Sequence, residues 1–132
     1  MYMSSSINDG SLHKLNNNWV LWFHHNIRKW DASSFKQVEK ISTIKDFIIT
    51  FDIINNLGGF SSLHFFLMKE NILPIWEDEH NINGGCWSIK TTINYVDKLF
   101  RKIAIYLIGE KLSTEKNLIN GISICMKQNE LC

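Results

Sequence analysis

The stretch Asn18-Trp19-Val20-Leu21-Trp22-Phe23-His24-His25 decides how the chain begins to fold, because its side chains alternate in an extended backbone. Every second residue from Trp19 to Phe23 would point to one side, and every second residue from Val20 to His24 to the other. Both sets are bulky. The stretch therefore predicts a β-strand that is covered, at least in part, on both faces.

Other short segments have the alternation or the aromatic content of strands. The segment at Leu63–Met68 is short and rich in aromatic residues, and Asn83-Gly84-Gly85 is a turn signal that precedes another candidate. The predicted strands after the first are Phe35–Ile41, Leu63–Met68, Cys86–Lys90 and Gly121–Lys127.

Two segments repeat apolar residues at helical spacing. The first follows Ser42 and Thr43, which offer an N-cap, and it ends at the turn Asn55–Gly59. The second stops near Gly109. Their apolar positions are Ile44, Phe47, Ile48, Phe51 and Ile54 in the first, and Val96, Leu99, Phe100, Ile103 and Leu107 in the second. The order of elements predicts an α+β fold with the helices on one face of a sheet.

Composition limits the classes of function. The chain has 132 residues, 45% of them hydrophobic, which predicts one domain, with residues 1–11 as a flexible polar tail. The net charge of +1 gives no broad electrostatic footprint for duplex nucleic acid. An odd number of cysteines without CxxC spacing indicates reduced thiols in a cytoplasmic protein. Neither a signal peptide nor a stretch of the about 20 apolar residues that cross a bilayer is visible, so no membrane is expected.

Two of the five tryptophans stand in polar surroundings where a core would not place them. Trp30 lies in a polar loop, and Trp76 opens the acidic run Glu77-Asp78-Glu79. Loops concentrate binding residues, and two flat indoles beside a carboxylate suit a planar cationic ring with N–H donors on one edge. A methylated guanine fits that description.

At this point the residues resemble a known family. The segment His13–Phe23 resembles the opening strand of eukaryotic translation initiation factor 4E, the mRNA 5′-cap-binding protein. Pro74–Glu79 followed by Asn83–Trp87 is similar to the central signature of the family, and Tyr106–Glu110 to the end of its second long helix. All five tryptophans fall on family positions, and the resemblance covers residues 12–127.

The resemblance implies a fold and a ligand. The family fold is a curved antiparallel sheet with helices behind its convex face and the cap of messenger RNA held in a slot on the concave side. The resemblance implies that Trp30 and Trp76 stack on the methylated base. It also implies that Glu77 accepts the hydrogens of guanine N1 and N2, and that the Trp76 backbone N–H donates to O6. We expect residues 12–132 to form this domain.

Departures from the family pattern affect the phosphate side of the slot. The chain ends at Cys132, where the family continues through further strands and a third helix. Lys127 takes the place of an arginine as the implied phosphate-binding residue, and Cys86 stands at another basic position. We expect affinity for the triphosphate to suffer, because each lost cation removes a charge-assisted contact.

The surface that binds protein partners in the family is also altered. In the family, scaffold factor 4G and repressor proteins bind that surface through YxxxxLΦ peptides, and a tryptophan on the first helix of the family member contacts the peptide. Ile48 stands at the position of this tryptophan here. Arg101 and Lys102 stand where leucine and glutamate are usual, and Lys14 replaces a proline. The residues expected to line the surface are His13, Ile44, Ile48, Ile105 and Gly109. Conventional scaffold binding should therefore be weak.

Other interpretations remain beside the binding of capped mRNA. Trp19, Trp22 and Trp87 alternate into strands, which favours core packing for all three. No motif for catalysis or a cofactor is visible, and neighbouring His24 and His25 point to opposite faces of a strand, so neither an enzyme nor a metal site is expected. The rival function is a truncated protein-interaction module or decoy with little cap binding. A further rival is an incomplete product that folds poorly because a sheet edge stays uncovered.

Overall fold

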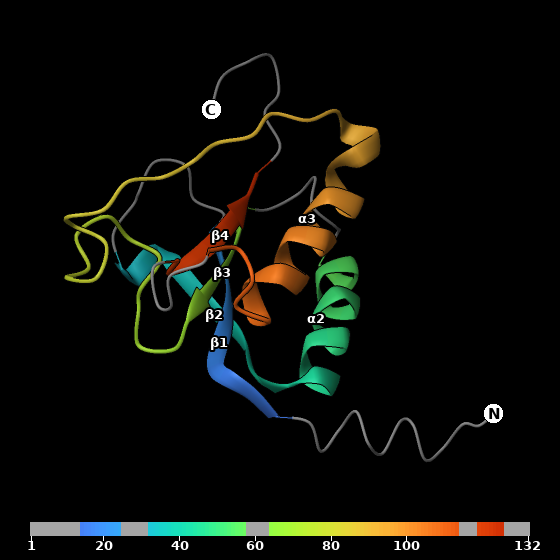
Figure 1. The fold of residues 1–132 in the computed structure, drawn as a ribbon, viewed down its shortest axis with the longest axis horizontal. Helices are drawn as coiled ribbons and strands as arrows, with labels where there is room; N and C mark the ends of the chain where they lie inside the picture. The colour runs from blue at the N-terminus through green and yellow to red at the C-terminus, as the bar shows by residue number, and fades with distance from the viewer. Residues whose placement is uncertain (1–13, 25–31, 58–63, 114–118, 126–132) are drawn as a thin grey trace.

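The described part of the chain forms a curved antiparallel sheet with helices on one side (Figure 1). The computed structural model describes residues 14–24, 32–57, 64–113 and 119–125. Its elements in chain order are β1 (Lys14–His24), η1 (Ala32–Ser34), β2 (Phe35–Thr43), α2 (Ile44–Asn56), β3 (His64–Lys69), α3 (Ile93–Ile108) and β4 (Gly121–Ile124). The expected α+β class is confirmed. Residues 1–11, predicted as a tail, lie outside the described residues.

Strand β1 organises the sheet, whose order is β2-β1-β3-β4. Trp19 pairs with Ile41 of β2 and with Lys69 of β3, and all neighbouring strands run antiparallel. Residues directly opposite one another share a face of the sheet. The register therefore places Trp19 and Ile41, both fully buried, on the same face.

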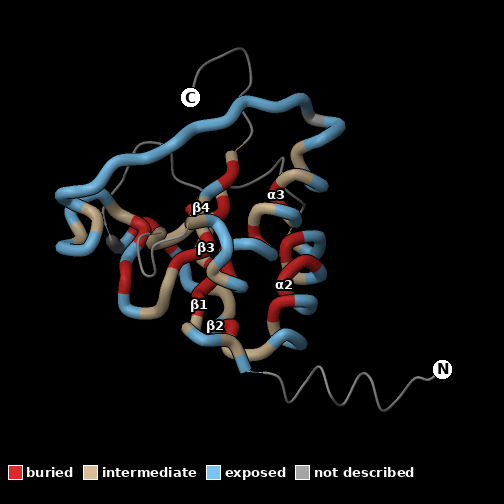
Figure 2. Tube along the Cα trace, viewed as in Figure 1, coloured by how far each residue is buried: buried red, intermediate tan, exposed pale blue. Residues whose placement is uncertain are grey.

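The core lies between that face and the two helices. From the sheet it takes Trp19, Leu21, Ile41, Phe65, Leu67 and Ile124, and from the helices Phe47, Phe51, Ile54, Phe100, Ala104, Leu107 and Ile108. Helices α2 and α3 lie together on this side of the sheet, and the rings of Phe51 and Phe100 meet edge to face with centroids 6.4 Å apart. Figure 2 shows where the buried positions lie along both helices and the strands.

The face of the sheet opposite α2 and α3 is also lined with rings. Phe35 lies 4.7 Å from His24 and 5.2 Å from Phe66, measured between ring centroids, and His64 stacks on Phe66 at 4.2 Å. His24 is buried on this face, away from α2 and α3. The prediction from the first stretch of sequence, a strand with bulky residues on both faces, is confirmed.

Helix α2 begins where the sequence placed its N-cap. The hydroxyl Oγ1 of Thr43 accepts from the Asp46 backbone N–H at 3.1 Å, and the Asp46 carboxylate accepts from the backbone N–H groups of Ser42 and Thr43 at 3.0 and 3.1 Å. Burial alone would raise the pKa of Asp46, but these donors lower it below its usual value. The reciprocal bonds satisfy N–H groups that no helical carbonyl can reach.

The predicted strand Cys86–Lys90 is wrong. Residues 84–92 form no strand and are exposed, as the long pale-blue segment in Figure 2 shows, so the described chain has one strand fewer than expected. Local alternation is not sufficient for a strand, because a ladder needs a neighbour to take its backbone hydrogen bonds. Trp87, expected in the core, is 97% exposed for the same reason. Trp19 is fully buried as predicted, and Trp22 is half-buried.

Candidate functional site

A loop leaves the end of β3 and carries two of the predicted site residues. Asn71 adopts a positive φ of 75°, a left-handed conformation that short polar side chains tolerate and that turns the backbone sharply. Ile72 and Pro74 then bury their side chains and anchor the start of the loop. The Glu70 backbone N–H also donates to the carbonyl of Asn18, at 2.9 Å, which fixes the exit from the sheet.

The apex of this loop presents Trp76 and Glu77 to solvent. Trp76 is 61% exposed, and Glu77 is exposed beside it. The Asp78 backbone N–H donates to the carbonyl of Ile75 at 3.3 Å, which closes a tight turn around the two residues. A large indole left in water next to a carboxylate is available for stacking and hydrogen bonding to a ligand. The structure thus places Trp76 and Glu77 side by side on a loop, as the sequence predicted.

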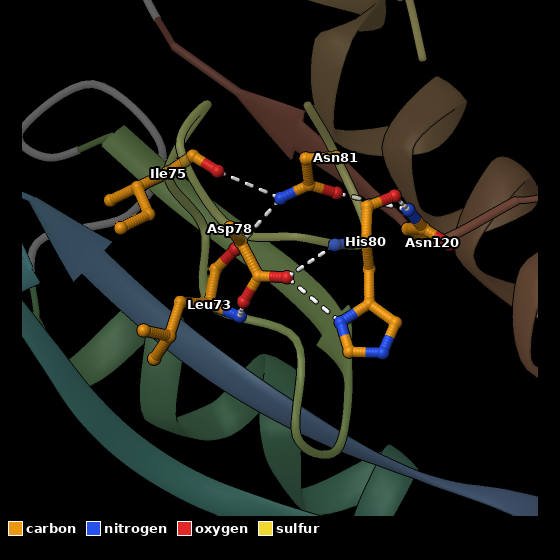
Figure 3. A network of polar contacts seen from close by, with 6 residues as sticks. All are labelled: Leu73, Ile75, Asp78, His80, Asn81 and Asn120. Carbon is orange, nitrogen blue, oxygen red and sulfur yellow. Dashed lines mark hydrogen bonds and ion pairs between the residues drawn. The ribbon is translucent and has the colours of Figure 1, made fainter. Parts of the chain in front are cut away.

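The Asp78 carboxylate holds the loop together from inside the turn (Figure 3). One oxygen accepts from the Leu73 backbone N–H at 2.8 Å, and the other lies 2.8 Å from both the backbone nitrogen and ring Nδ1 of His80. Its side chain is only 8% exposed. Burial would raise the pKa of Asp78, but these donors from His80 and Leu73 lower it below its usual value, so the carboxylate stays charged at neutral pH.

Two asparagine side chains complete this network. The amide of Asn81 donates to the carbonyls of Leu73 and Ile75 at 2.9 and 2.8 Å. The amide of Asn120, next to β4, donates to the carbonyl of His80 at 2.8 Å and to Oδ1 of Asn81 at 2.9 Å. The loop that carries Trp76 is therefore tied to itself on both sides of its apex and to a segment much later in the chain.

A hollow of about 280 Å³ lies on the face of the sheet opposite α2 and α3, beside the start of the loop. It is lined by Val20, Trp22, Gln37 and residues 69–73. Glu70 forms an ion pair with Lys40 of β2 at 2.8 Å and accepts from the Asn18 amide at 3.1 Å. These bonds and the neighbouring Lys40 charge lower the pKa of Glu70 below its usual value. The loop is thus connected to β1 and β2 as well.

The structure tests only some of the predicted site residues. Trp30, Lys127 and His13 lie outside the described residues, so the distance between Trp30 and Trp76 stays untested. Cys86, singled out at a basic position of the family, is exposed. The sequence analysis assigned no role to Asp78, Asn81 or Asn120. An aspartate in a loop often accepts from the backbone N–H two residues further on and so forms a turn. This local pattern could have indicated Asp78.

The predicted partner-binding residues of α2 and α3 that the structure describes are exposed, and we call this set of residues the helix face. Its members in the described chain are Ile44 (39% exposed), Ile48 (61%), Ile105 (56%) and the exposed Gly109. On the same two helices the guanidinium of Arg101 lies over the Phe51 ring, 4.3 Å from its centroid. Arg101 Nε also donates to the Asp97 carboxylate at 3.1 and 3.2 Å, which helps to hold this cation beside the ring.

Among the residues that the structure describes, no group of three His, Cys, Asp or Glu side chains is arranged to hold a metal ion. None of the helices described is both long and apolar enough to span a bilayer.

The sequence is similar to one family along almost its whole length. The family model for eukaryotic initiation factor 4E matches residues 14–131. Initiation factor 4E-3 of Caenorhabditis elegans is 27% identical over 126 residues, which are 88% of this chain and 50% of that protein. Human initiation factor 4E type 1B is 32% identical over 117 residues, 83% of this chain and 48% of that protein. The chain thus spans about half the length of the curated relatives it matches.

The fold is similar to solved structures of the same family. C. elegans initiation factor 4E-3, in complex with the 4E-binding protein Mextli and a cap analog, superimposes with a TM-score of 0.77 at 28% identity, covering 88% of this chain and 68% of that chain. Ascaris suum initiation factor 4E-3 in complex with m7G cap gives a TM-score of 0.73 at 29% identity, with the same coverage of 88% and 68%. A schistosome initiation factor 4E, complexed with m7GpppG and 4E-BP, gives 0.70 at 27% identity, covering 84% of this chain and 64% of that chain.

Proposed function

Since the chain belongs to the eukaryotic initiation factor 4E family, we propose that it binds the 7-methylguanosine 5′ cap of messenger RNA in translation initiation or its control. Trp76 and Glu77 carry this proposal, because an exposed indole and an exposed carboxylate stand together on a braced loop. Relatives with a similar fold were solved with the m7G cap or a cap analog. We propose that it acts in the cytoplasm, through reversible binding and without a catalytic step.

In this proposal the base lies between the indoles of Trp76 and Trp30. Methylation at N7 makes guanine a delocalised cation, so each indole face contributes about 0.5–2 kcal/mol of cation–π attraction. Glu77 accepts the N1 and N2 hydrogens, and its charge complements that of the base, which roughly doubles the strength of neutral bonds. The Trp76 backbone N–H donates to O6. Unmethylated guanine loses the charge-dependent part of this attraction.

The phosphate chain is assigned to Lys127 in the same proposal. A lysine is a compact point charge, whereas an arginine would present a fork that matches two phosphate oxygens. Cys86 is an exposed thiol where a second cation is usual in the family, and it brings no charge-assisted contact. Most of the binding free energy should therefore come from the base, and the number of phosphates should change affinity little.

Tryptophan fluorescence tests the proposal directly. Titration of the chain with 7-methyl-GTP should quench indole emission in a saturable way, and Trp76→Leu should lose most of that quenching together with at least a tenfold part of the affinity. The matched control is Trp87→Leu, because Trp87 is 97% exposed but lies outside the proposed slot. Equal loss in both variants, or no quenching of the unmodified chain, would reject the proposed site.

The helix face favours a second function, the docking of a scaffold or repressor protein of translation. Ile48 and Ile105 are more than half exposed on neighbouring helices, an arrangement that suits an amphipathic partner helix. Arg101, fixed on Phe51, adds a cation to that surface. In the extreme form of this alternative the chain is an interaction module or decoy with little cap binding. Helix-face binding without nucleotide quenching would support that form.

A further inference from the structure

We propose that Asp78, Asn81 and Asn120 are positioning residues that hold Trp76 and Glu77 in a ligand-ready arrangement before any ligand arrives. The ligand in this inference rests on the proposed function, but the bracing of the apex does not. None of the three side chains needs to touch the ligand. Their hydrogen bonds instead determine where the exposed indole and carboxylate point.

The first step of the argument is that the apex is held from both ends of its turn. Asp78 accepts from the backbone N–H of Leu73 before the apex and from that of His80 after it, both at 2.8 Å. Asn81 donates to the carbonyls of Leu73 and Ile75 at 2.9 and 2.8 Å. Figure 3 shows both side chains inside the loop, with the backbone wrapped around them. Carboxylate and amide thus satisfy backbone groups that no strand or helix of the loop could satisfy.

The second step is that Asn120 attaches this self-contained loop to the sheet. Its amide reaches His80 and Asn81, which precede it by 40 and 39 residues in the sequence. Its backbone carbonyl accepts from the Lys69 N–H at 2.9 Å, at the end of β3. One residue therefore bridges the start of the loop, its far side and the beginning of β4. Without the amide of Asn120 the start of the loop would stay anchored at Glu70, but its far side, at His80 and Asn81, would lose these two bonds to the segment before β4.

The third step concerns what such bracing does for binding. Ordering a loop on binding costs conformational entropy, and a loop that is ordered beforehand avoids that cost. Stacking would also need the Trp76 indole in a fixed orientation, since a planar base stacks only on a ring that is parallel to it. Loss of the braces should therefore weaken affinity without removing any ligand contact. We expect Asn120→Ala to weaken 7-methyl-GTP binding three- to tenfold and Asn81→Ala at least tenfold.

The experiment has a ligand-free arm that measures the apex itself. The chain is labelled with 5-fluorotryptophan, and the ¹⁹F resonance of Trp76 is assigned from its disappearance in Trp76→Phe. Asn120→Ala should shift or broaden the Trp76 resonance and leave that of the fully buried Trp19 unchanged. Asn83→Ala is the matched control, because Asn83 is an exposed asparagine of the same loop. A change in the Trp19 resonance of Asn81→Ala would show that this variant disturbs folding. Asn120→Ala is the milder variant, because it keeps the backbone hydrogen bond to Lys69.

The second arm repeats the nucleotide titration on the same samples. A changed Trp76 resonance with weakened 7-methyl-GTP binding in Asn120→Ala, and neither change in Asn83→Ala, is the expected result. An unchanged Trp76 resonance in Asn120→Ala would overturn the inference whatever the nucleotide does, and so would a changed resonance with unaltered affinity. If the unmodified chain binds no nucleotide while the resonance still changes, the proposed function fails and the bracing of the apex stands.

Discussion

Replacing Glu77 by glutamine should separate recognition of the base from stability of the fold. Glu77 is exposed at the apex of the loop, whereas the buried carboxylate that holds the loop belongs to its neighbour Asp78. Glu77→Gln should therefore leave thermal unfolding unchanged and act on the complex alone. Glutamine keeps the shape of the side chain, but it presents one acceptor oxygen and one N–H₂ donor to the two N–H donors of the base.

The magnitude follows from the hydrogen bond that is lost. One N–H of the bound base would be desolvated without an acceptor, which costs about 1–3 kcal/mol. At about 1.4 kcal/mol for each factor of ten, this corresponds to roughly 5- to 150-fold weaker binding of 7-methyl-GTP. Glu79→Gln is the matched control, because Glu79 is an exposed glutamate two residues further on. Its effect should stay below about twofold, as surface substitutions away from the contact usually do.

The assay is a fluorescence titration of both variants and the unmodified chain with 7-methyl-GTP in one buffer. Thermal unfolding followed by circular dichroism shows whether both variants stay folded. Equal dissociation constants for Glu77→Gln and Glu79→Gln would refute the reasoning, because the base would then be read by another group.

Three further variants test the helix face, the sheet and the acid sensitivity of the fold. Ile48→Trp combined with Lys102→Glu should raise the affinity for a YxxxxLΦ peptide at least tenfold, because the double variant restores an indole and a carboxylate acceptor. Isothermal titration measures this affinity. Tight peptide binding by the unmodified chain would contradict the interpretation of the helix face. Gly121→Ala should lower the free energy of unfolding by about 1–3 kcal/mol in urea titrations, because a Cβ there would come within 2.5 Å of the Leu67 carbonyl oxygen. An unchanged urea midpoint would contradict this prediction and would mean that β4 can shift away from β3 at little cost. Burial, with the nearby His24 charge, lowers the pKa of His64 from 6.5 to about 4. Between these pH values the unfolded chain therefore binds more protons than the folded chain. The free energy of unfolding should fall as the pH drops from 6.5 towards 4. The full shift corresponds to about 3 kcal/mol, which partial exposure should reduce to about 1–2 kcal/mol, and His64→Phe should flatten this pH profile; an equal slope in that variant would place the titration elsewhere.

Local sequence patterns were sufficient for the elements that build the core. The alternation around Trp19 predicted a strand with bulky residues on both faces, and β1 has both. Helix α2 begins directly after Thr43 because the capping residues stand next to the helix they cap. Such signals act over a few residues, so they can be read without knowing what lies across the fold.

The pattern failed where structure depends on distant partners. Cys86–Lys90 alternates like a strand, yet no described strand pairs with it, and Trp87 remains in solvent. Sequence periodicity reports what a segment could bury, not whether a neighbour is present. Contacts with distant parts of the chain, rather than the local pattern, therefore determine whether such a segment becomes a strand.

The candidate site shows the same division. Trp76 and Glu77 were predicted as ligand contacts from their neighbours in the sequence, a tryptophan beside an acidic run, and the structure leaves both exposed. Asn120 could not be identified in that way, because its partners lie 39 and 40 residues away and an asparagine beside a strand has no distinctive pattern. Exposed candidate residues of a loop can thus be found from sequence more readily than the residues that hold the loop in place.

Preference for the methylated base tests the central proposal most directly. The measurement is the ratio of the dissociation constants for GTP and 7-methyl-GTP, obtained by tryptophan quenching of the unmodified chain under identical conditions. Because two indoles and a carboxylate would respond to the charge of the methylated ring, GTP should bind at least tenfold more weakly, a difference of about 1.4 kcal/mol. Equal dissociation constants, or the absence of quenching by both nucleotides, would contradict the proposal that this loop reads the cap.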